Sequence, residues 1–97
     1  MKSNNFKNKT AKILFDVKSI ILKPNKPFKL TSGRLSPVYV DCRKVISHIK
    51  ARRSLIKMGV ALIKKEIDIK KIDFVAGGET GGIPYAAWIS EKINKPM

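Results

Sequence analysis

The chain has 97 residues, of which 43% are hydrophobic, and it carries a formal net charge of +14. This length supports one small domain with a modest core, and the hydrophobic content excludes a disordered tail. No apolar run approaches the roughly 20 residues that cross a membrane, and the basic N-terminus lacks the apolar core of a signal peptide. The single Cys42 allows no internal disulfide. Together these features predict a cytoplasmic protein with no membrane partner.

The positive charge raises the hypothesis of a small, basic, non-catalytic module that binds nucleic acid. Most of the 21 basic residues are lysines, however, and they are scattered through every segment rather than gathered with aromatic side chains on one element. Such scatter is typical of a solvated surface. The same field would attract a substrate that carries several phosphates. We therefore keep the nucleic-acid module as the alternative and expect no specific nucleic-acid partner.

Apolar residues recur at spacings of three and four over residues 4–21, which predicts an amphipathic helix. Residues 28–31 and 38–41 alternate apolar and polar side chains around turn-forming residues, so they predict a hairpin or two strands joined by a short loop. Residues 42–48 have no clear pattern, and the lone Cys42 and His48 are interpreted as structural. A second helix is predicted over residues 51–67, with Ile56, Val60 and Ile67 among its buried side chains.

Residues 72–76 form a short, almost wholly apolar run, as in a strand that is buried on both faces of a parallel sheet. A third helix is predicted from about residue 82 to residue 93, and Met97 would begin the next strand. A buried parallel strand needs neighbours on both sides, so the sheet is expected to be unfinished. The chain is thus predicted to be one partial α/β domain, with a helix and hairpin in residues 1–47 and the start of the α/β core in residues 48–97.

Four of the six glycines lie between this strand and the third helix. Glycine frees the backbone from the limits that a side chain sets on φ, and a helix that opens after such a loop directs several N–H groups at one point. Ligands bind at the carboxyl ends of strands in open α/β sheets. The loop therefore predicts an anion site, in which Thr80 caps the helix or binds a phosphate oxygen while Pro84 fits the first turn. The loop matches neither a P-loop nor the dinucleotide fingerprint, and a glycine-rich turn packed against a neighbouring strand is the other interpretation.

Residues 28–43 hold Ser-Gly-Arg-x-Ser-Pro followed by an aromatic strand, and residues 75–84 hold an apolar strand, the glycine loop and Ile-Pro. With Lys-Pro-Met at 95–97, these blocks closely resemble orotate phosphoribosyltransferase, of the type I phosphoribosyltransferases, over nearly the whole chain. The resemblance implies a glycosyltransferase of pyrimidine biosynthesis, which uses Mg²⁺ and acts as a homodimer in the full-length family. Its substrates would be orotate and phosphoribosyl pyrophosphate (PRPP), and its products orotidine monophosphate and pyrophosphate.

The resemblance also implies an incomplete phosphoribosyltransferase-type fold: an N-terminal helix and a hood hairpin, followed by the first strand and helices of a parallel sheet. The hood would cover the base, with the main chain of Tyr39 and Val40 bonding orotate. Thr31 stands where many family members carry a substrate-contacting Lys, and Gly81 where some carry another, so the charge at the diphosphate must come from elsewhere. PRPP and its pyrophosphate would be bound by Thr31, Gly77, Gly78, Glu79, Thr80, Gly81 and Gly82.

No side chain is required as a nucleophile, because fixed donors at the departing diphosphate and proximity of the base to the anomeric carbon favour the reaction. No catalytic residue and no protein ligand for a metal is assigned, and Asp41 and Glu79 are expected to cap backbone groups or to be exposed. The family's ribose-phosphate loop and its mobile basic loop have no counterpart in these 97 residues. The resemblance therefore predicts the N-terminal portion of the enzyme, truncated and inactive alone.

Overall fold

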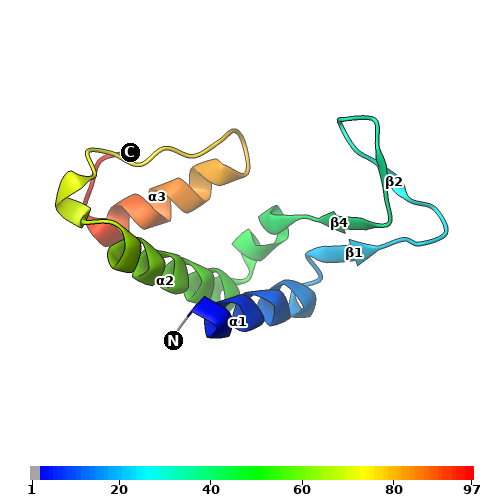
Figure 1. Ribbon diagram of the computed structural model, residues 1–97, viewed down its shortest axis with the longest axis horizontal. Helices are drawn as coiled ribbons and strands as arrows, with labels where there is room; N and C mark the ends of the chain where they lie inside the picture. Colours follow the sequence, from blue (N-terminus) through cyan, green and yellow to red (C-terminus); the bar gives the residue numbers. More distant parts are fainter. Residues whose placement is uncertain (1–2) are drawn as a thin grey trace.

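The computed structural model describes residues 3–97, with side chains described from residue 5. The molecule is elongated, with extents of 48 × 28 × 24 Å; the helices α2 and α3 occupy one end and the strands the other, while α1 runs beneath (Figure 1). In chain order the elements are α1 (Ser3–Asp16), β1 (Ile20–Leu22), β2 (Phe28–Lys29), β3 (Leu35–Ser36), β4 (Val38–Val40), the 3₁₀ helix η1 (Cys42–Ser47), α2 (Ile49–Glu66), the 3₁₀ helix η2 (Ile69–Lys71) and α3 (Gly82–Ile93).

The first helix is shorter than its pattern predicted. It ends at Asp16, and Lys18 follows with a φ of 61°. The N–H of Ser19 donates to the Leu14 carbonyl at 2.8 Å, and the N–H of Lys18 donates to the Phe15 carbonyl at 3.0 Å. These two bonds close a Schellman-type helix end, in which a residue of positive φ satisfies the last carbonyls. The prediction of a helix over residues 4–21 was therefore wrong at its end, because the apolar residues 20–22 form strand β1 instead.

The strands pair differently from the predicted hairpin. β1 and β4 are antiparallel, with Ile20 opposite Val40, whereas β2 and β3 form a second antiparallel pair, with Phe28 opposite Ser36. Gly33 has a φ of 90° and its N–H donates to the Leu30 carbonyl at 2.8 Å, which makes the β2–β3 turn tight. The hairpin alternative, in which residues 28–31 pair with residues 38–41, was wrong, because β1 supplies an apolar, β-branched partner for β4. The other alternative, two strands that do not pair with each other, is closer, since both segments contain a strand.

The core lies between α2 and α3. Ile56, Val60 and Ile93 are buried together, and Trp88 packs against them. The two helices begin and end within two residues of their predicted bounds, and residues 42–48, which the sequence left open, form η1. Ile67 was predicted to be buried and is 49% exposed, because α2 ends at Glu66, one residue before it. Within residues 3–97 we find no helix with both the length and the apolar character of a membrane span.

Residues 72–76 are extended but unpaired as a strand, which corrects the predicted buried strand. The N–H of Val75 donates to the Pro96 carbonyl at 2.9 Å, so the residues after α3 lie beside this segment, where the next strand was expected to begin. Phe74 is 66% exposed. A strand needs a ladder of hydrogen bonds on at least one side. The described part of the chain supplies too short a neighbour to form one.

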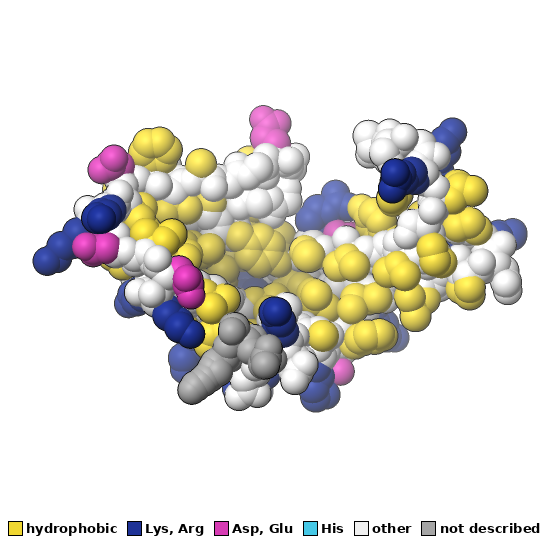
Figure 2. All heavy atoms as spheres, in the orientation of Figure 1, with side chains coloured by type: hydrophobic (Ala, Val, Ile, Leu, Met, Phe, Trp, Pro, Cys, Tyr) yellow, Lys and Arg dark blue, Asp and Glu magenta, His cyan; other side chains and the backbone are white. Residues whose placement is uncertain are grey.

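The hood keeps much of its apolar surface in solvent. Hydrophobic side chains gather over the strands in Figure 2. Leu22 is 58% exposed and Leu35 is 66% exposed, and Val38, Tyr39 and Val40 are also exposed. Contiguous exposed apolar surface of this kind marks an interaction site more often than free surface.

Candidate functional site: the glycine loop, η1 and the open edge of β4

Gly77 is the position at which the glycine loop requires a glycine. A Cβ added there would meet the backbone carbonyl of Gly82 and would lie 2.8 Å from the Cβ of Ala86. The backbone of the loop therefore packs directly on the first turns of α3. A positive φ is not the reason, because among the glycines only Gly33 has one. The expectation that the loop glycines free the backbone in φ was wrong, and close approach explains the glycine at position 77.

The loop leaves a row of backbone donors free next to the start of α3. The N–H of Gly82 donates to the Gly78 carbonyl at 2.9 Å, and the N–H of Ile83 donates to the Thr80 carbonyl at 3.3 Å. The N–H groups of Glu79, Thr80 and Gly81 donate to no acceptor within residues 3–97. Free N–H groups at the positive end of a helix dipole form an anion site.

Pro84 and Thr80 were both expected to act at the start of α3. Pro84 lies in the first turn of α3, as predicted. Thr80 does not cap the helix: Gly81 is the N-cap residue, and no side chain bonds there. The Thr80 side chain is exposed instead, next to the free N–H groups. The peptide bond between Glu79 and Thr80 is cis.

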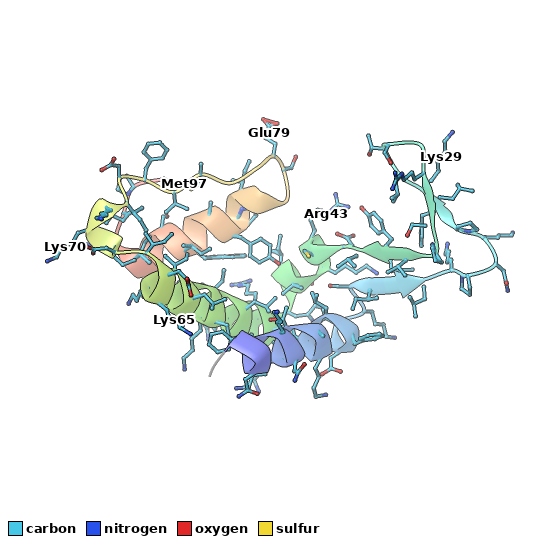
Figure 3. All side chains as sticks on the ribbon, in the orientation of Figure 1. Lys29, Arg43, Lys65, Lys70, Glu79 and Met97 are labelled. Atoms are coloured by element: carbon cyan, nitrogen blue, oxygen red, sulfur yellow. The ribbon has the colours of Figure 1, made fainter. Side chains whose placement is uncertain are left out.

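Arg43 lies between the hood and the glycine loop (Figure 3). Asp41 caps η1 by accepting the Arg43 backbone N–H at 3.1 Å, as its expected capping role required. The same carboxylate accepts the Arg43 side chain, with Nε 2.9 Å from Oδ1 and Nη2 3.5 Å from Oδ2. The stem of Arg43 runs beside Gly81, since a Cβ added at Gly81 would lie 3.3 Å from Arg43 Cγ. Arg43 has no role that its sequence position predicts, because its contact with Gly81 exists only in the folded chain.

The pKa values of this pair move in the directions that an ion pair produces. The hydrogen bond from Arg43 lowers the pKa of the Asp41 carboxyl below its ordinary value, against a smaller opposing effect of burial. The hydrogen bond to Asp41, its charge and the neighbouring Tyr39 raise the pKa of the Arg43 guanidinium. Both groups are thus charged at neutral pH, and Arg43 also lies close to Tyr39 of the hood.

Tyr85 ties η1 to α3. Its hydroxyl donates to the Cys42 carbonyl at 2.7 Å, and its ring meets Trp88 edge to face at 5.8 Å. Burial raises the pKa of the Tyr85 hydroxyl, which remains protonated and able to donate. Cys42 itself is an exposed free thiol, so its structural contribution is its backbone carbonyl. This bond fixes the residues before Arg43 against the helix that follows the glycine loop.

The open edge of β4 presents the backbone of Val40. The N–H of Asp41 donates to the Ser19 carbonyl at 2.8 Å, and Tyr39 lies opposite Ile21. Hydrogen-bonded and non-bonded pairs alternate along an antiparallel ladder, so the backbone groups of Tyr39 face β1 and those of Val40 face away. Val38 shares the outward orientation, but its N–H and C=O both bond the Ser36 hydroxyl. Val40 is therefore the β4 residue whose donor and acceptor are unoccupied within the described chain. The main chain of Tyr39, which was also expected to bond orotate, faces β1 instead.

Thr31 lies apart from these groups. It is exposed at the turn between β2 and β3, and no hydrogen bond joins it to the glycine loop within the described chain. The hairpin is connected to β4 through the rings of Phe28 and Tyr39, which are 5.6 Å apart. The structure thus brings both Tyr39 and Gly81 close to Arg43 and places Thr31 at the β2–β3 turn of the hood.

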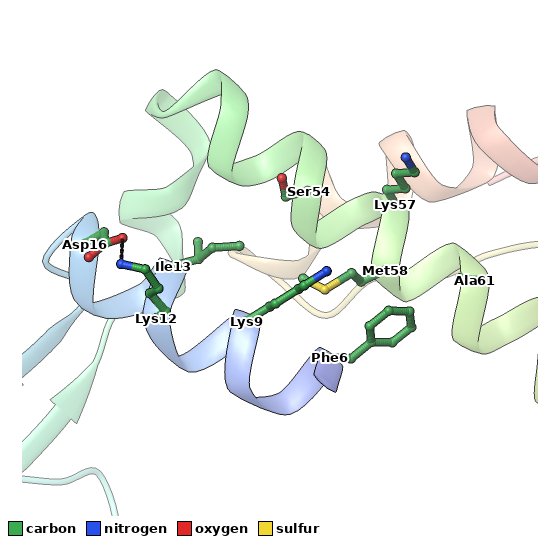
Figure 4. A pocket seen from close by; sticks show the side chains of 9 residues that line it. All are labelled: Phe6, Lys9, Lys12, Ile13, Asp16, Ser54, Lys57, Met58 and Ala61. Atoms are coloured by element: carbon green, nitrogen blue, oxygen red, sulfur yellow. Dashed lines mark hydrogen bonds and ion pairs between the residues drawn. The ribbon is translucent and has the colours of Figure 1, made fainter. Parts of the chain in front are cut away.

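Two hollows of the surface lie away from this site. One of about 450 Å³ lies between α1 and α2, with Phe6 and Met58 at one end and the 3.1 Å ion pair of Lys12 and Asp16 at the other (Figure 4). No three His, Cys, Asp or Glu side chains gather to hold a metal ion in the part of the chain described. These residues therefore do not form a metal site by themselves.

Two solved structures show which class of fold this is. An orotate phosphoribosyltransferase from Aeropyrum pernix matches 90% of the chain with a TM-score of 0.76 and 28% identity, covering 49% of that structure. A UMP synthase from Leishmania donovani matches 90% of the chain with a TM-score of 0.73 and 29% identity, covering 18% of that structure. The chain therefore has part of a phosphoribosyltransferase-type fold, as its motifs predicted.

The sequences of relatives narrow the class further. The chain is 45% identical over 87 residues to orotate phosphoribosyltransferase of Rhizobium rhizogenes, which covers 90% of the chain. It is 42% identical over its full length to the corresponding protein of Sinorhizobium fredii. No protein-family model matches it. The chain is thus homologous to part of orotate phosphoribosyltransferase, which confirms the resemblance, and it spans 38% and 44% of the length of these two relatives.

Proposed function

We propose that this chain forms the base-binding hood and the pyrophosphate loop of an orotate phosphoribosyltransferase. The reaction joins the anomeric carbon of PRPP to a ring nitrogen of orotate and releases pyrophosphate. As the anomeric bond stretches, negative charge grows on the departing diphosphate, and donors fixed at that position stabilise the transition state. The free N–H groups of Glu79, Thr80 and Gly81 supply such donors without reorganisation.

One observation carries the proposal: the loop that the sequence shares with the family is also the place where the fold leaves backbone donors free. The orotate ring is assigned to the open edge of β4, where Val40 has an unoccupied N–H and C=O and Tyr39 lies alongside. A base held at β4 and a diphosphate held at the loop would present the two reactants to each other, which is the proximity that the reaction needs. Gly77, Gly78 and Gly82 remain proposed members of the PRPP site as part of the loop, and Thr31 remains a proposed member from the β2–β3 turn, apart from the loop.

The proposal includes Mg²⁺, a homodimer and a cytoplasmic location. Mg²⁺ enters with the diphosphate, because this ion is usually bound through substrate phosphates and waters rather than by an all-protein cage. The exposed apolar side chains of the strands, among them Leu22, Leu35 and Val38, support a covering partner such as a second copy. The free, exposed Cys42 suits a reducing compartment. No specific nucleic-acid partner is proposed, because the lysines remain scattered.

The test is a chimera in which this chain replaces the matching segment of the Rhizobium rhizogenes relative. Loss of orotate absorbance is followed with PRPP and Mg²⁺. We expect turnover within about tenfold of the parent enzyme, which corresponds to about 1.4 kcal/mol of transition-state stabilisation. The 97-residue chain alone is expected to show no turnover. A folded chimera that binds neither substrate would contradict the proposal.

A further inference from the structure

The glycine loop has no positive side chain of its own. Residues 77–83 contain one carboxylate, Glu79, and no Lys or Arg. Figure 3 shows Glu79 at the outer tip of the loop, pointing away from the rest of the fold. Backbone N–H groups carry only partial charges, whereas a diphosphate carries several full ones. A cation held beside the loop would complete the site electrostatically.

Arg43 is the cation that the fold places beside the loop. Its Cγ would lie 3.3 Å from a Cβ at Gly81, and its Cδ 3.6 Å from the same point. Residue 43 belongs to η1, and the bond from Tyr85 to the Cys42 carbonyl holds η1 against α3 at 2.7 Å. The position of Arg43 relative to Gly81 is therefore fixed from both sides, by the chain of η1 and by the helix that follows the loop.

Asp41 orients the guanidinium and leaves part of it free. The carboxylate accepts Nε at 2.9 Å and Nη2 at 3.5 Å, which occupies one edge of the planar group. The remaining N–H groups of a guanidinium form a second edge that matches phosphate oxygens. The Arg43 side chain is 63% exposed, so this second edge is open to a ligand. Guanidinium is also the cationic group best suited to bidentate phosphate recognition.

The ion pair of the Arg43 and Asp41 side chains contributes little to the stability of the fold. Asp41 already caps η1 through the Arg43 backbone N–H, and that bond does not need the guanidinium. An exposed ion pair adds little to stability. The second contact of the carboxylate, to the side chain, thus has a clearer role in holding the guanidinium in one direction than in stabilising the fold.

We propose that Arg43, oriented by Asp41, binds the diphosphate of PRPP from the side opposite the loop N–H groups and replaces the Lys that this loop lacks at Gly81. This inference rests on the proposed function and adds the source of charge at the diphosphate. Asp41 is a positioning residue, because it acts on the ligand through Arg43. The guanidinium also lies near Tyr39 of the hood, so Arg43 has neighbours in both the hood and the glycine loop.

The test is an NMR titration of the ¹⁵N-labelled 97-residue chain with PRPP and with inorganic pyrophosphate, using orthophosphate as the anion control. The Arg43 Nη–H signals and the N–H signals of Thr80 and Gly81 are followed together. We expect all of them to shift and saturate at one ligand concentration, and orthophosphate to act much more weakly. A purely structural Arg43 would leave its Nη–H signals unchanged.

Variants give the size of the effect. R43Q should weaken pyrophosphate binding by about tenfold, because it removes charge-assisted hydrogen bonds. R43K, which keeps the charge and loses the planar fork, should weaken binding less and shows whether R43Q fails by losing charge or by misfolding. R53Q on α2 removes the same charge away from the site, and it should bind as the unaltered chain does.

The outcomes separate the two proposals. Saturable shifts at Thr80 and Gly81 with no shift at the Arg43 Nη–H groups, or equal affinities for R43Q and R53Q, would overturn the role of Arg43 and leave the loop as the diphosphate site. Equal shifts with orthophosphate would show general anion attraction and would also overturn it. An absence of saturable shifts anywhere would contradict the proposed function and the inference with it.

Discussion

Replacing Gly77 with Ala tests whether the glycine loop packs on α3 as described. The new Cβ would meet the Gly82 carbonyl and would lie 2.8 Å from the Ala86 Cβ. Neither neighbour is the flexible end of a side chain, so the loop backbone itself must move. Overpacking of this kind costs about 1 to 3 kcal/mol. We expect G77A to lower the free energy of unfolding by about 2 kcal/mol and to displace the free N–H groups of the loop.

The matched control is Gly78, one residue along the same loop. A Cβ there would have no heavy atom within 4 Å, and its φ lies outside the left-handed region. G78A should therefore leave the free energy of unfolding unchanged or raise it by up to about 1 kcal/mol, because Ala restricts the unfolded chain. Urea unfolding followed by circular dichroism measures both variants. Equal unfolding free energies for G77A and G78A would refute the close approach of Gly77 to α3.

Three further predictions concern the contacts around η1. In the chimera, Gly81→Val should reduce affinity for PRPP more than for orotate, because the new side chain displaces the Arg43 stem 3.3 Å away; equal losses in binding assays would remove the loop from the site. Tyr85→Phe removes the hydrogen bond to the Cys42 carbonyl and should lower the free energy of unfolding by about 0.5 to 1.5 kcal/mol. It should also speed amide hydrogen exchange in η1. Unchanged exchange rates would contradict the role of this bond in holding η1 against α3. The pKa of Asp41 is depressed in the folded chain, so its contribution to stability is present above its unfolded value of about 3.9 and is lost as the pH falls through the folded pKa. Carboxyl NMR titration should find a folded pKa below that unfolded value, and Arg43→Gln should raise it; a folded pKa at or above the unfolded value would contradict the ion pair.

The helices α2 and α3 were predictable because their apolar residues repeat with the helical period and their ends carry ordinary signals. The end of α1 was not, because the apolar period continues through Ile20 and Ile21, and nothing in the sequence identifies Lys18 as a residue of positive φ. β1 was consequently missed. Without it, the alternation in residues 28–31 and 38–41 led to the wrong strand pairing, although both segments do contain strands.

The position of the glycine loop could be predicted from the sequence, but the residue that supplies positive charge beside it could not. The glycine cluster identifies the loop from sequence alone, and the missing Lys at Gly81 indicates that a cation must come from elsewhere. Which cation fills that place depends on a contact between η1 and the loop, and residues 43 and 81, which are far apart in the sequence, meet only in the folded chain. The backbone of Val40 likewise required the strand register, since a shift of one residue would exchange it with Tyr39.

A crystal structure of the chimera with PRPP, Mg²⁺ and orotate bound tests most directly where the diphosphate and the base bind. We expect the diphosphate against the N–H groups of Thr80 and Gly81, with the free edge of Arg43 on its other side. We expect the orotate ring along the open edge of β4 at Val40. A diphosphate bound elsewhere, for example against the lysines of the hollow between α1 and α2, would contradict this expectation.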